Sequence, residues 1–476
     1  MCCSDLPPPT TSNLRRLMAL EQQTLDIQDS LVASLLSGEN FCPTRPASIK
    51  ETGLGEEFVE QLICKYLAVF GTSKGKTIAD HICLSYNIIE PVLGSLRVSQ
   101  FIVHAGSAPF NDYYYSLTTQ GRERAMGFLD ACAYVGPAPV PLMDYVISVE
   151  AQSITAEAPG PEKLIKALRD ISVDPGLFDS LGPAVNSGAG MFLYGAPGNG
   201  KSTLARRITL CFGNVIWIPH ALYEDGQVIK LYDSAYHKQA AGDQQNLIKY
   251  GEHDRRWLKI SRPTVVVGGE LTMDNLELRH DARTNINEAP LQMKSNCGCL
   301  LIDDFGRQRI EPRQLLNRWI IPLEMHHDFL TLSTGKKIQV PFDQLVIFST
   351  NLEPRELVDE AFLRRIPFKI EIGDPNEEEF HHLFELYACS FGCEYRREVI
   401  DDLLERHYRP TNRPLRRCQA RDLLLQIRSY CNYTGQPMEM RRENFDRAVK
   451  SYFATVLGEK QKPSGNETPS RAASTV

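Results

Sequence analysis

The sequence lacks any long apolar run. No stretch of its 476 residues approaches the roughly 20 consecutive apolar residues that a membrane-spanning helix needs. The segment Met1–Pro9 also lacks the basic and then apolar pattern of a secretory signal. We therefore expect a cytoplasmic protein with no membrane contact.

The cysteines lack the spacing of a disulfide framework or a zinc site. There are 13 of them, an odd number, and they are scattered through apolar segments, which favours reduced thiols in the cores. The close pairs Cys297 with Cys299 and Cys389 with Cys393 do not have the two-residue spacing of paired metal ligands. We predict no metal site built from cysteine.

The sequence also has no excess of basic residues. The 52 Lys and Arg stand against 59 Asp and Glu, which gives a formal net charge of −7. This balance argues against a basic nucleic-acid-binding coat over the whole surface, but it says nothing about one local patch. Hydrophobic residues make up 42% of the chain, enough at this length for several cores, so we predict a multidomain protein.

Breaks in composition divide the chain into segments. Three short helical patterns followed by two strands, from Thr52 to Ala133, have the order of a winged helix. After a Pro- and Ala-rich linker, apolar strands such as Val215–Ile218, Leu300–Ile302 and Leu345–Phe348 alternate with helices, as in a parallel sheet covered on both faces. The predicted segments are a loosely ordered arm (1–50), a winged-helix domain (51–133), a linker with a helical lead-in (134–187), an α/β core that binds nucleotide (188–372), a helical lid (373–457) and a disordered tail (458–476).

One segment has the pattern of a phosphate-binding loop. Gly195–Ser202 reads GAPGNGKS and lies between the apolar strand Met191–Tyr194 and a helical pattern. Its glycines let backbone N–H groups turn toward phosphates, and the start of the helix adds its dipole. We expect Lys201 to reach the β- and γ-phosphates and Ser202 to bind Mg²⁺. The predicted phosphate contacts are Gly195, Ala196, Pro197, Gly198, Asn199, Gly200, Lys201, Ser202 and Thr203.

Two later apolar strands end in polar side chains. Cys299–Ile302 is followed by Asp303 and Asp304, and Val346–Thr350 is followed by Asn351. We predict that Asp303 holds Mg²⁺ and that Asp304 polarises the attacking water. Asn351 is expected to orient that water from a strand that lies between the other two. Each strand end, taken alone, is also compatible with ordinary turn chemistry.

In this order the motifs resemble those of the AAA+ ATPases, over roughly residues 144–457. The resemblance implies ATP as the nucleotide, Walker A at the phosphate loop, Walker B at Asp303 and Asp304, sensor 1 at Asn351 and sensor 2 at Arg421. It also implies a homo-oligomeric ring, most often a hexamer. In such a ring Arg365, with Arg364 beside it, would complete the site of the neighbouring subunit. Most hydrolytic members have Glu where this chain has Asp304, so we expect slow hydrolysis.

An alternating segment, Phe329–Val340, turns at Thr334–Lys336 and predicts a β-hairpin. With Glu288–Asn296 it resembles the pre-sensor-1 hairpin branch, which holds the MoxR-type chaperones and the enhancer-dependent transcription activators. A further insert, Thr264–Leu271, resembles neither closely. The whole chain resembles a bacterial family of winged-helix AAA+ ATPases that has no agreed substrate.

Three functions stay open on these grounds. The first is an ATP-driven remodeller of a protein client, the second an ATP-regulated DNA-binding transcription regulator, and the third a nucleotide switch that barely hydrolyses. The third helix of the winged helix, Asn87–Ser99, offers Arg97 against Glu90, and the wing turn, Gly106–Asp112, carries no cation. Because phosphate neutralisation dominates DNA affinity, protein contact is favoured over DNA binding.

Overall fold

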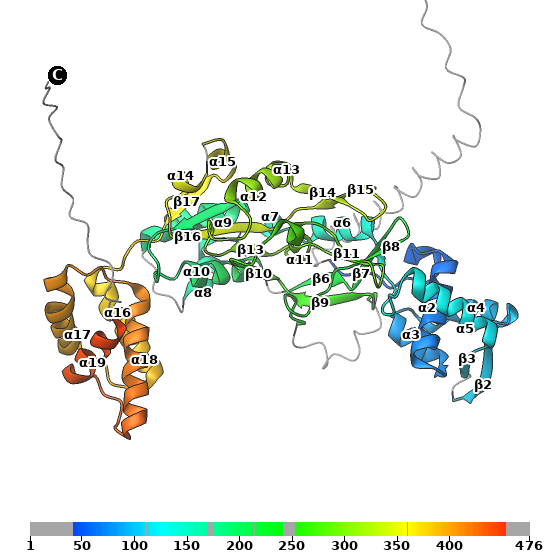
Figure 1. Cartoon of the computed structure of the whole chain (residues 1–476), viewed down its shortest axis with the longest axis horizontal. Helices are drawn as coiled ribbons and strands as arrows, with labels where there is room; N and C mark the ends of the chain where they lie inside the picture. Colours follow the sequence, from blue (N-terminus) through cyan, green and yellow to red (C-terminus); the bar gives the residue numbers. More distant parts are fainter. Residues whose placement is uncertain are drawn as a thin grey trace, which may run out of the picture. The chain divides into compact units, whose positions relative to one another are not determined.

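The computed structural model describes residues 41–109, 112–157, 159–169, 175–213, 215–240, 253–358 and 360–453 (Figure 1). The predicted tail, 458–476, and residues 1–40 of the predicted arm lie outside these ranges. The described chain forms two compact units. The larger comprises residues up to Gly195 together with Lys201–Ile372, and the smaller comprises Ala196–Gly200 together with the residues from Gly373 onward. In the ranges given, no helix is long and apolar enough to cross a membrane.

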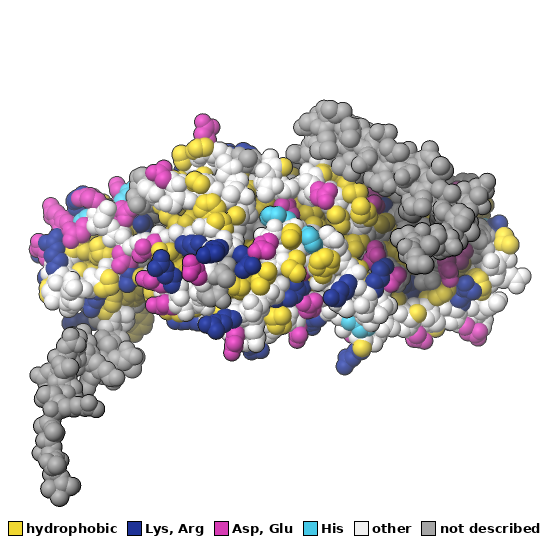
Figure 2. Space-filling model, turned by 90° about the horizontal axis from the view of Figure 1, so that it is seen from above, with side chains coloured by type: hydrophobic (Ala, Val, Ile, Leu, Met, Phe, Trp, Pro, Cys, Tyr) yellow, Lys and Arg dark blue, Asp and Glu magenta, His cyan; other side chains and the backbone are white. Residues whose placement is uncertain are grey.

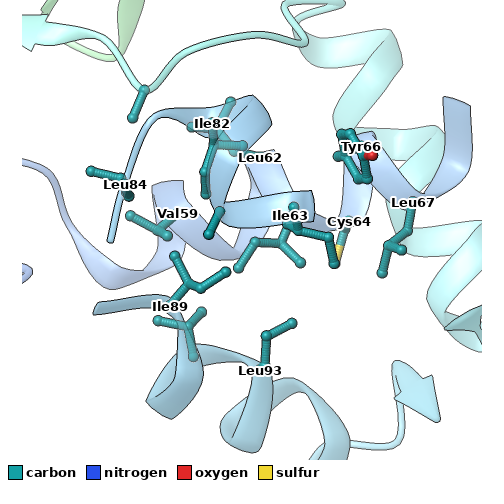
Figure 3. Close-up of a cluster of buried hydrophobic side chains, with 14 of the residues drawn as sticks. Val59, Leu62, Ile63, Cys64, Tyr66, Leu67, Ile82, Leu84, Ile89 and Leu93 are labelled. Atoms are coloured by element: carbon teal, nitrogen blue, oxygen red, sulfur yellow. The ribbon is translucent and has the colours of Figure 1, made fainter. Parts of the chain in front are cut away.

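The larger unit begins with helices closed by a small three-stranded sheet, in the segment where the sequence predicts a winged helix. Helices α2 and α4 bury apolar faces against each other, and Figure 3 shows Val59 and Ile63 of α2 facing Ile89 and Leu93 of α4. Strands β2 and β3 form the expected hairpin, and β1 adds a third strand that the sequence did not indicate. The elements are α2 (Glu56–Phe70), β1 (Ser73–Lys74), α3 (Gly75–Ile82), α4 (Tyr86–Val98), β2 (Ile102–Ala108), β3 (Asp112–Leu117) and α5 (Thr119–Ala131).

A parallel sheet forms the centre of the larger unit, with the strand order β10-β13-β16-β5-β17. The strands are β5 (Met191–Tyr194), β10 (Thr264–Val267), β13 (Cys299–Ile302), β16 (Leu345–Thr350) and β17 (Phe368–Glu371). The three inner strands β5, β13 and β16 are mostly apolar and almost completely buried, as strands covered on both faces must be, whereas the edge strand β17 carries Lys369 and Glu371 on an exposed side. One face packs against α8 (Pro161–Leu168), α9 (Pro175–Ser187) and α10 (Lys201–Ile208), and the other against α12 (Pro312–Arg318) and Trp319. The predicted α/β class, with helices on both faces of a parallel sheet, is confirmed.

Two further sheets in the described chain correct the sequence prediction. Strand β6 (Val215–Pro219), expected in the parallel sheet, pairs antiparallel with β9 (Trp257–Ser261) instead. Its Val215 is exposed whereas Ile216 is buried, so one face is only partly covered. Conversely, the segment Thr264–Leu271, expected as a separate insert, contains the edge strand β10. A mixed sheet combines β4 (Val140–Pro141), β7 (Ala221–Glu224), β8 (Gln227–Lys230), β12 (Ile286–Glu288) and β11 (Arg279–Asp281).

The predicted hairpin is present as β14 (His327–Thr331) and β15 (Lys337–Pro341), paired antiparallel. A buried ion pair fixes its start: Arg318 donates to both carboxylate oxygens of Asp328, at 2.6 and 3.0 Å, and Gln292 donates to Asp328 at 3.0 Å. The remaining helices of the larger unit are α6 (Leu142–Ala151), α7 (Ile154–Glu157), α11 (Leu291–Lys294), α13 (Ile320–Met325), α14 (Pro354–Leu357) and α15 (Glu360–Arg365).

The smaller unit is helical. Asn376 begins α16 with a capping box, because its side chain accepts from the Glu379 N–H at 2.8 Å while Glu379 accepts from the Asn376 N–H at 3.1 Å. Phe380, Phe384 and Phe445 lie in its core. The helices are α16 (Glu377–Phe391), α17 (Arg397–Leu403), a π-helical turn (Leu404–Tyr408), α18 (Arg417–Thr434) and α19 (Arg442–Tyr452).

Candidate nucleotide site

The carboxyl ends of three neighbouring strands bring predicted site residues to one edge of the sheet. Strand β16 lies between β5 and β13, as predicted, with Thr350 level with Tyr194 and Phe348 level with Ile302. Gly195, Asp303 and Asn351 follow directly from these ends. This is the edge at which open α/β sheets bind their ligands.

Lys201 is buried at the start of α10, and its ammonium group contacts two other segments at this edge. Its side chain Nζ donates to the Gly195 carbonyl at 2.9 Å and to Asn351 Oδ1 at 2.8 Å. The residue is 6% exposed. A buried cation therefore stands next to the ends of β5 and β16.

Ser202 and Asp303 bring two oxygen atoms together. The Ser202 hydroxyl donates to Asp303 Oδ1 at 2.8 Å, which joins the first turn of α10 to the end of β13. The same carboxylate oxygen accepts from the Asp304 N–H at 3.2 Å. The pair offers a hydroxyl and a carboxylate at one point of the sheet edge.

Asp304 has a strained backbone that neighbouring groups hold in place. Its φ of +50° lies in the left-handed region, which a side chain other than glycine seldom adopts. The Gln308 side chain donates to the carbonyls of Asp303 and Asp304, at 2.9 and 3.2 Å. Asn351 Nδ2 donates to Asp304 Oδ1 at 3.3 Å. The Asn351 amide thus links two groups. Its oxygen accepts a hydrogen bond from the Lys201 ammonium group, and its nitrogen donates one to the Asp304 carboxylate.

The loop between β5 and α10 requires its glycines. Gly195, Gly198 and Gly200 have φ values of +131°, +86° and +86°, all disfavoured for other residues. A Cβ atom on Gly195 would also lie 2.5 Å from the Ile372 carbonyl oxygen. Among the other predicted contacts, Pro197 and Thr203 are exposed and Ala196 is half-buried.

The middle of this loop belongs to the smaller unit and contacts its helix α18. The Gly198 carbonyl accepts from the Cys418 N–H at 2.9 Å. The Asn199 side chain, 2% exposed, accepts from the Arg417 N–H at 3.3 Å and donates to Asp374 Oδ1 at 2.7 Å. Asn199 therefore uses its side chain for contacts inside the protein.

The three predicted arginines have carboxylate partners. Arg364 is 80% exposed and lies 3.5 Å from Glu360. Arg365 pairs with Glu324 on α13 at 2.5 Å. In the smaller unit, Arg421 pairs with its neighbour Asp422 at 2.9 Å.

Sequence reasoning missed three residues that support these groups: Gln308, Glu324 and Asp374. Gln308 lies six residues after the end of β13, in a segment without periodicity. Asp374 belongs to a Gly-Asp-Pro stretch that signals only a boundary between segments.

A family described as "Domain of unknown function (DUF8689)" matches residues 376–451, within the smaller unit. No curated protein matches the chain. Similar solved structures include NtrX from Brucella abortus, 15% identical over 57% of this chain and 52% of that chain, with a TM-score of 0.35. NtrX from Brucella abortus in complex with ADP is 14% identical over 63% of this chain and 60% of that chain, with a TM-score of 0.38. A RuvB mutant from Thermotoga maritima is 13% identical over 63% of this chain and 72% of that chain, with a TM-score of 0.33. The match to the first NtrX structure spans about half of its length.

Proposed function

We propose that this protein binds ATP with Mg²⁺ and hydrolyses it to ADP and phosphate. The observation that carries the proposal is the chain of contacts at the sheet edge, where Asn351 joins Lys201 at 2.8 Å to Asp304 at 3.3 Å. A glycine loop, a buried lysine and carboxylates at neighbouring strand ends are the groups that a triphosphate with its metal ion needs. The order of the motifs, which resembles that of the AAA+ ATPases, supports the same conclusion.

The side chains at this edge fit Mg²⁺. Ser202 Oγ and Asp303 Oδ1 lie 2.8 Å apart, and both are hard oxygen donors of the kind that Mg²⁺ prefers. Mg²⁺ usually keeps several waters and takes only one or two carboxylates, so this small donor set is sufficient. When bound, the ion would neutralise charge on the β- and γ-phosphates.

The chain's own groups have separate tasks in the reaction. Backbone N–H groups of the loop hold the phosphates, and Lys201 turns its ammonium group from Asn351 toward a phosphate oxygen. Water attacks the γ-phosphorus while the bond to the bridging oxygen breaks, so that ADP leaves with the electron pair and one water proton is released. Asp304 accepts a hydrogen bond from the attacking water, and Asn351 holds that carboxylate in place. Because Asp is shorter than Glu, we expect slow turnover.

Phosphate release with purified protein tests the proposal. Lys201→Ala should abolish Mg²⁺-dependent release by weakening ATP binding, and Asp304→Ala should lower the rate steeply while ATP still binds. Lys166→Ala, which removes an exposed lysine from α8, is the matched control and should behave as wild type. Turnover unaffected by both site changes would remove the assignment.

We further propose that copies of the chain assemble into a ring and that turnover moves the β14–β15 hairpin against a protein client. Arg364, 80% exposed at the end of α15, is accessible to a neighbouring copy. Exposed apolar side chains lie on the hairpin and on the preceding helix: Phe329 at 44%, Ile321 at 49% and Met325 at 61%. Such a patch is typical of a protein contact.

A mixing experiment tests the assembly. Lys201→Ala chains would lack ATP binding but keep their arginines, whereas Arg364→Ala/Arg365→Ala chains would bind ATP but supply no arginine. If the arginines act on the neighbouring copy, mixing the two inactive proteins should restore part of the activity. No recovery, together with a monomeric mass by light scattering at saturating ATP, would refute it.

A second candidate function is DNA binding by the winged helix, and one observation favours it. Strand β1 brings Lys74 alongside the wing, with its ammonium 5.5 Å from the centre of the Tyr114 ring, so the wing is more basic than the sequence indicated. Against it, the wing turn, Gly106–Asp112, carries no cation. Elsewhere, on the face seen in Figure 2, basic and acidic side chains are mixed. Salt-dependent binding of duplex DNA that Lys74→Glu abolishes would support this function, and absence of binding at low salt would exclude it.

A further inference from the structure

Asp304 lies between two residues whose backbone is held by the central sheet. The Asp303 N–H donates to the Val267 carbonyl at 2.8 Å, and the Phe305 N–H donates to the Ser349 carbonyl at 2.7 Å. Between these fixed points Asp304 turns the chain with a φ of +50°. Because this left-handed conformation is unfavourable for a residue with a Cβ atom, the fold has to compensate for it by other contacts.

The side-chain amide of Gln308 bonds to three backbone groups of this turn. Its Nε2 donates to the carbonyls of Asp303 and Asp304, at 2.9 and 3.2 Å, and its Oε1 accepts from the Gly306 N–H at 2.8 Å. Gly306 has a positive φ as well, of +103°. The amide of Gln308 therefore bonds to the backbone on both sides of Phe305 and fixes the part of the turn that departs from ordinary geometry.

The backbone conformation of Asp304 decides where its carboxylate lies. The φ angle sets the direction of the Cα–Cβ bond relative to the fixed strand β13, and in the present conformation Asp304 Oδ1 lies 3.3 Å from Asn351 Nδ2. A change to the right-handed region, which is favoured for aspartate, would point the Cβ atom elsewhere and break this contact. The three hydrogen bonds of Gln308 act on backbone atoms, so its effect on the reaction passes through Asp304.

We infer that Gln308 is a positioning residue of the ATPase reaction, which keeps Asp304 in the left-handed conformation and so directs its carboxylate toward Asn351 and the attacking water. The inference rests on the proposed function, because it requires Asp304 to contact that water. Lys201 and Ser202, the residues proposed to meet the phosphates and Mg²⁺, make their own contacts to Asn351 and to the Asp303 carboxylate. Loss of the Gln308 amide should therefore slow the chemical step and leave nucleotide binding intact.

Two variants of the full-length protein test the inference, with kcat measured by phosphate release and the affinity for Mg²⁺·ATP measured by calorimetry. Gln308→Met keeps the length of the side chain without its hydrogen bonds. It should lower kcat roughly five- to thirtyfold, the factor by which the left-handed conformation is disfavoured, with the dissociation constant unchanged. Gln308→Glu keeps an acceptor for the Gly306 N–H but places a carboxylate oxygen against the carbonyls of Asp303 and Asp304. It should lower kcat at least as much.

A double variant separates positioning from general support of the fold. If Gln308 acts through Asp304, Gln308→Met should cause no further loss of the residual rate in the Asp304→Ala background. Gln314→Met is the matched control, because it makes the same chemical change at an exposed glutamine of α12 and should behave as wild type. Thermal melting checks that each variant folds, and Gln308→Glu serves the same test if Gln308→Met does not fold.

Three results would overturn the inference: an unchanged kcat in Gln308→Met, an ATP affinity that falls together with kcat, or a further loss in the Asp304→Ala background. Each of them leaves the proposed function standing as long as Lys201→Ala and Asp304→Ala still lower turnover. If those two changes have no effect, the proposed function itself fails, so the two failures are distinguishable.

Discussion

Replacing Asn351 with Asp isolates the role of its amide nitrogen. The variant keeps an oxygen for Lys201, 2.8 Å away in the native protein, but it places a second oxygen where Nδ2 now donates to Asp304 at 3.3 Å. Two unit charges about 4 Å apart repel by about 1 kcal/mol in water and about 4 kcal/mol near a protein surface. The Lys201 ammonium offsets part of this repulsion. We therefore expect a net repulsion of about 1 kcal/mol or more between the two carboxylates, which should move Asp304 away from Asn351.

The assay is phosphate release at saturating Mg²⁺·ATP. Because the repelled Asp304 carboxylate no longer holds the position from which it accepts a hydrogen bond from the attacking water, Asn351→Asp should lower kcat about five- to tenfold. Asn351→Ala removes the same hydrogen bond without adding charge, so it should lower kcat less. An equal kcat in wild type and Asn351→Asp would refute the proposed role of Asp304.

Three further predictions concern stability and the loop. Gly195→Ala should destabilise the protein by roughly 1 to 3 kcal/mol and weaken ATP binding. The reason is that φ of Gly195 is +131° and that the new Cβ would lie 2.5 Å from the Ile372 carbonyl oxygen. Thermal melting measures the loss of stability, and titration with ATP measures the loss of affinity. Arg318→Ala should cost about 3 to 5 kcal/mol in chemical unfolding, because it leaves the carboxylate of Asp328, 2% exposed, without its ion-pair partner. The exposed pair of Arg396 with Glu394 is its control, and its loss should cost less than about 1 kcal/mol; equal costs would contradict the burial argument. Burial lowers the pKa of His220 to about 4. In the unfolded chain this histidine binds a proton below a pH of about 6.5, whereas in the native protein it stays neutral until the pH falls to about 4. The free energy of unfolding should therefore fall by up to about 2 kcal/mol between pH 7 and pH 5, and His220→Gln should reduce that loss; an unchanged loss would show that other groups cause it.

Local features of the sequence predict most of the sheet edge. The loop from Gly195 to Ser202 is recognised because only glycines tolerate its φ values. Asp303 and Asn351 are found because each follows an apolar run that ends abruptly in polar residues. The position of β16 between β5 and β13 agrees with the predicted order as well.

The contacts that join distant segments could not be predicted. Strand β6 has the same apolar pattern as a strand of the parallel sheet, and nothing within its few residues specifies β9 as its partner. Asp374 and Asn199 are 175 positions apart in the chain, so their hydrogen bond leaves no local pattern. Pairing of this kind is decided by packing of the whole fold, and periodicity carries no information about it.

The assignment of Ala196–Gly200 to the smaller unit has a practical consequence for dissecting the chain. Helix α18 has its first two N–H groups satisfied from outside: Cys418 donates to the Gly198 carbonyl, and Arg417 donates to the Asn199 side chain. A fragment cut at Gly373 would leave both donors, and the Asp374 carboxylate, facing water instead of their native partners. The C-terminal helices are thus completed by the segment Ala196–Gly200, which lies far earlier in the chain. A fragment that contains only these helices would need the five residues of that segment supplied as a separate peptide or fused to it.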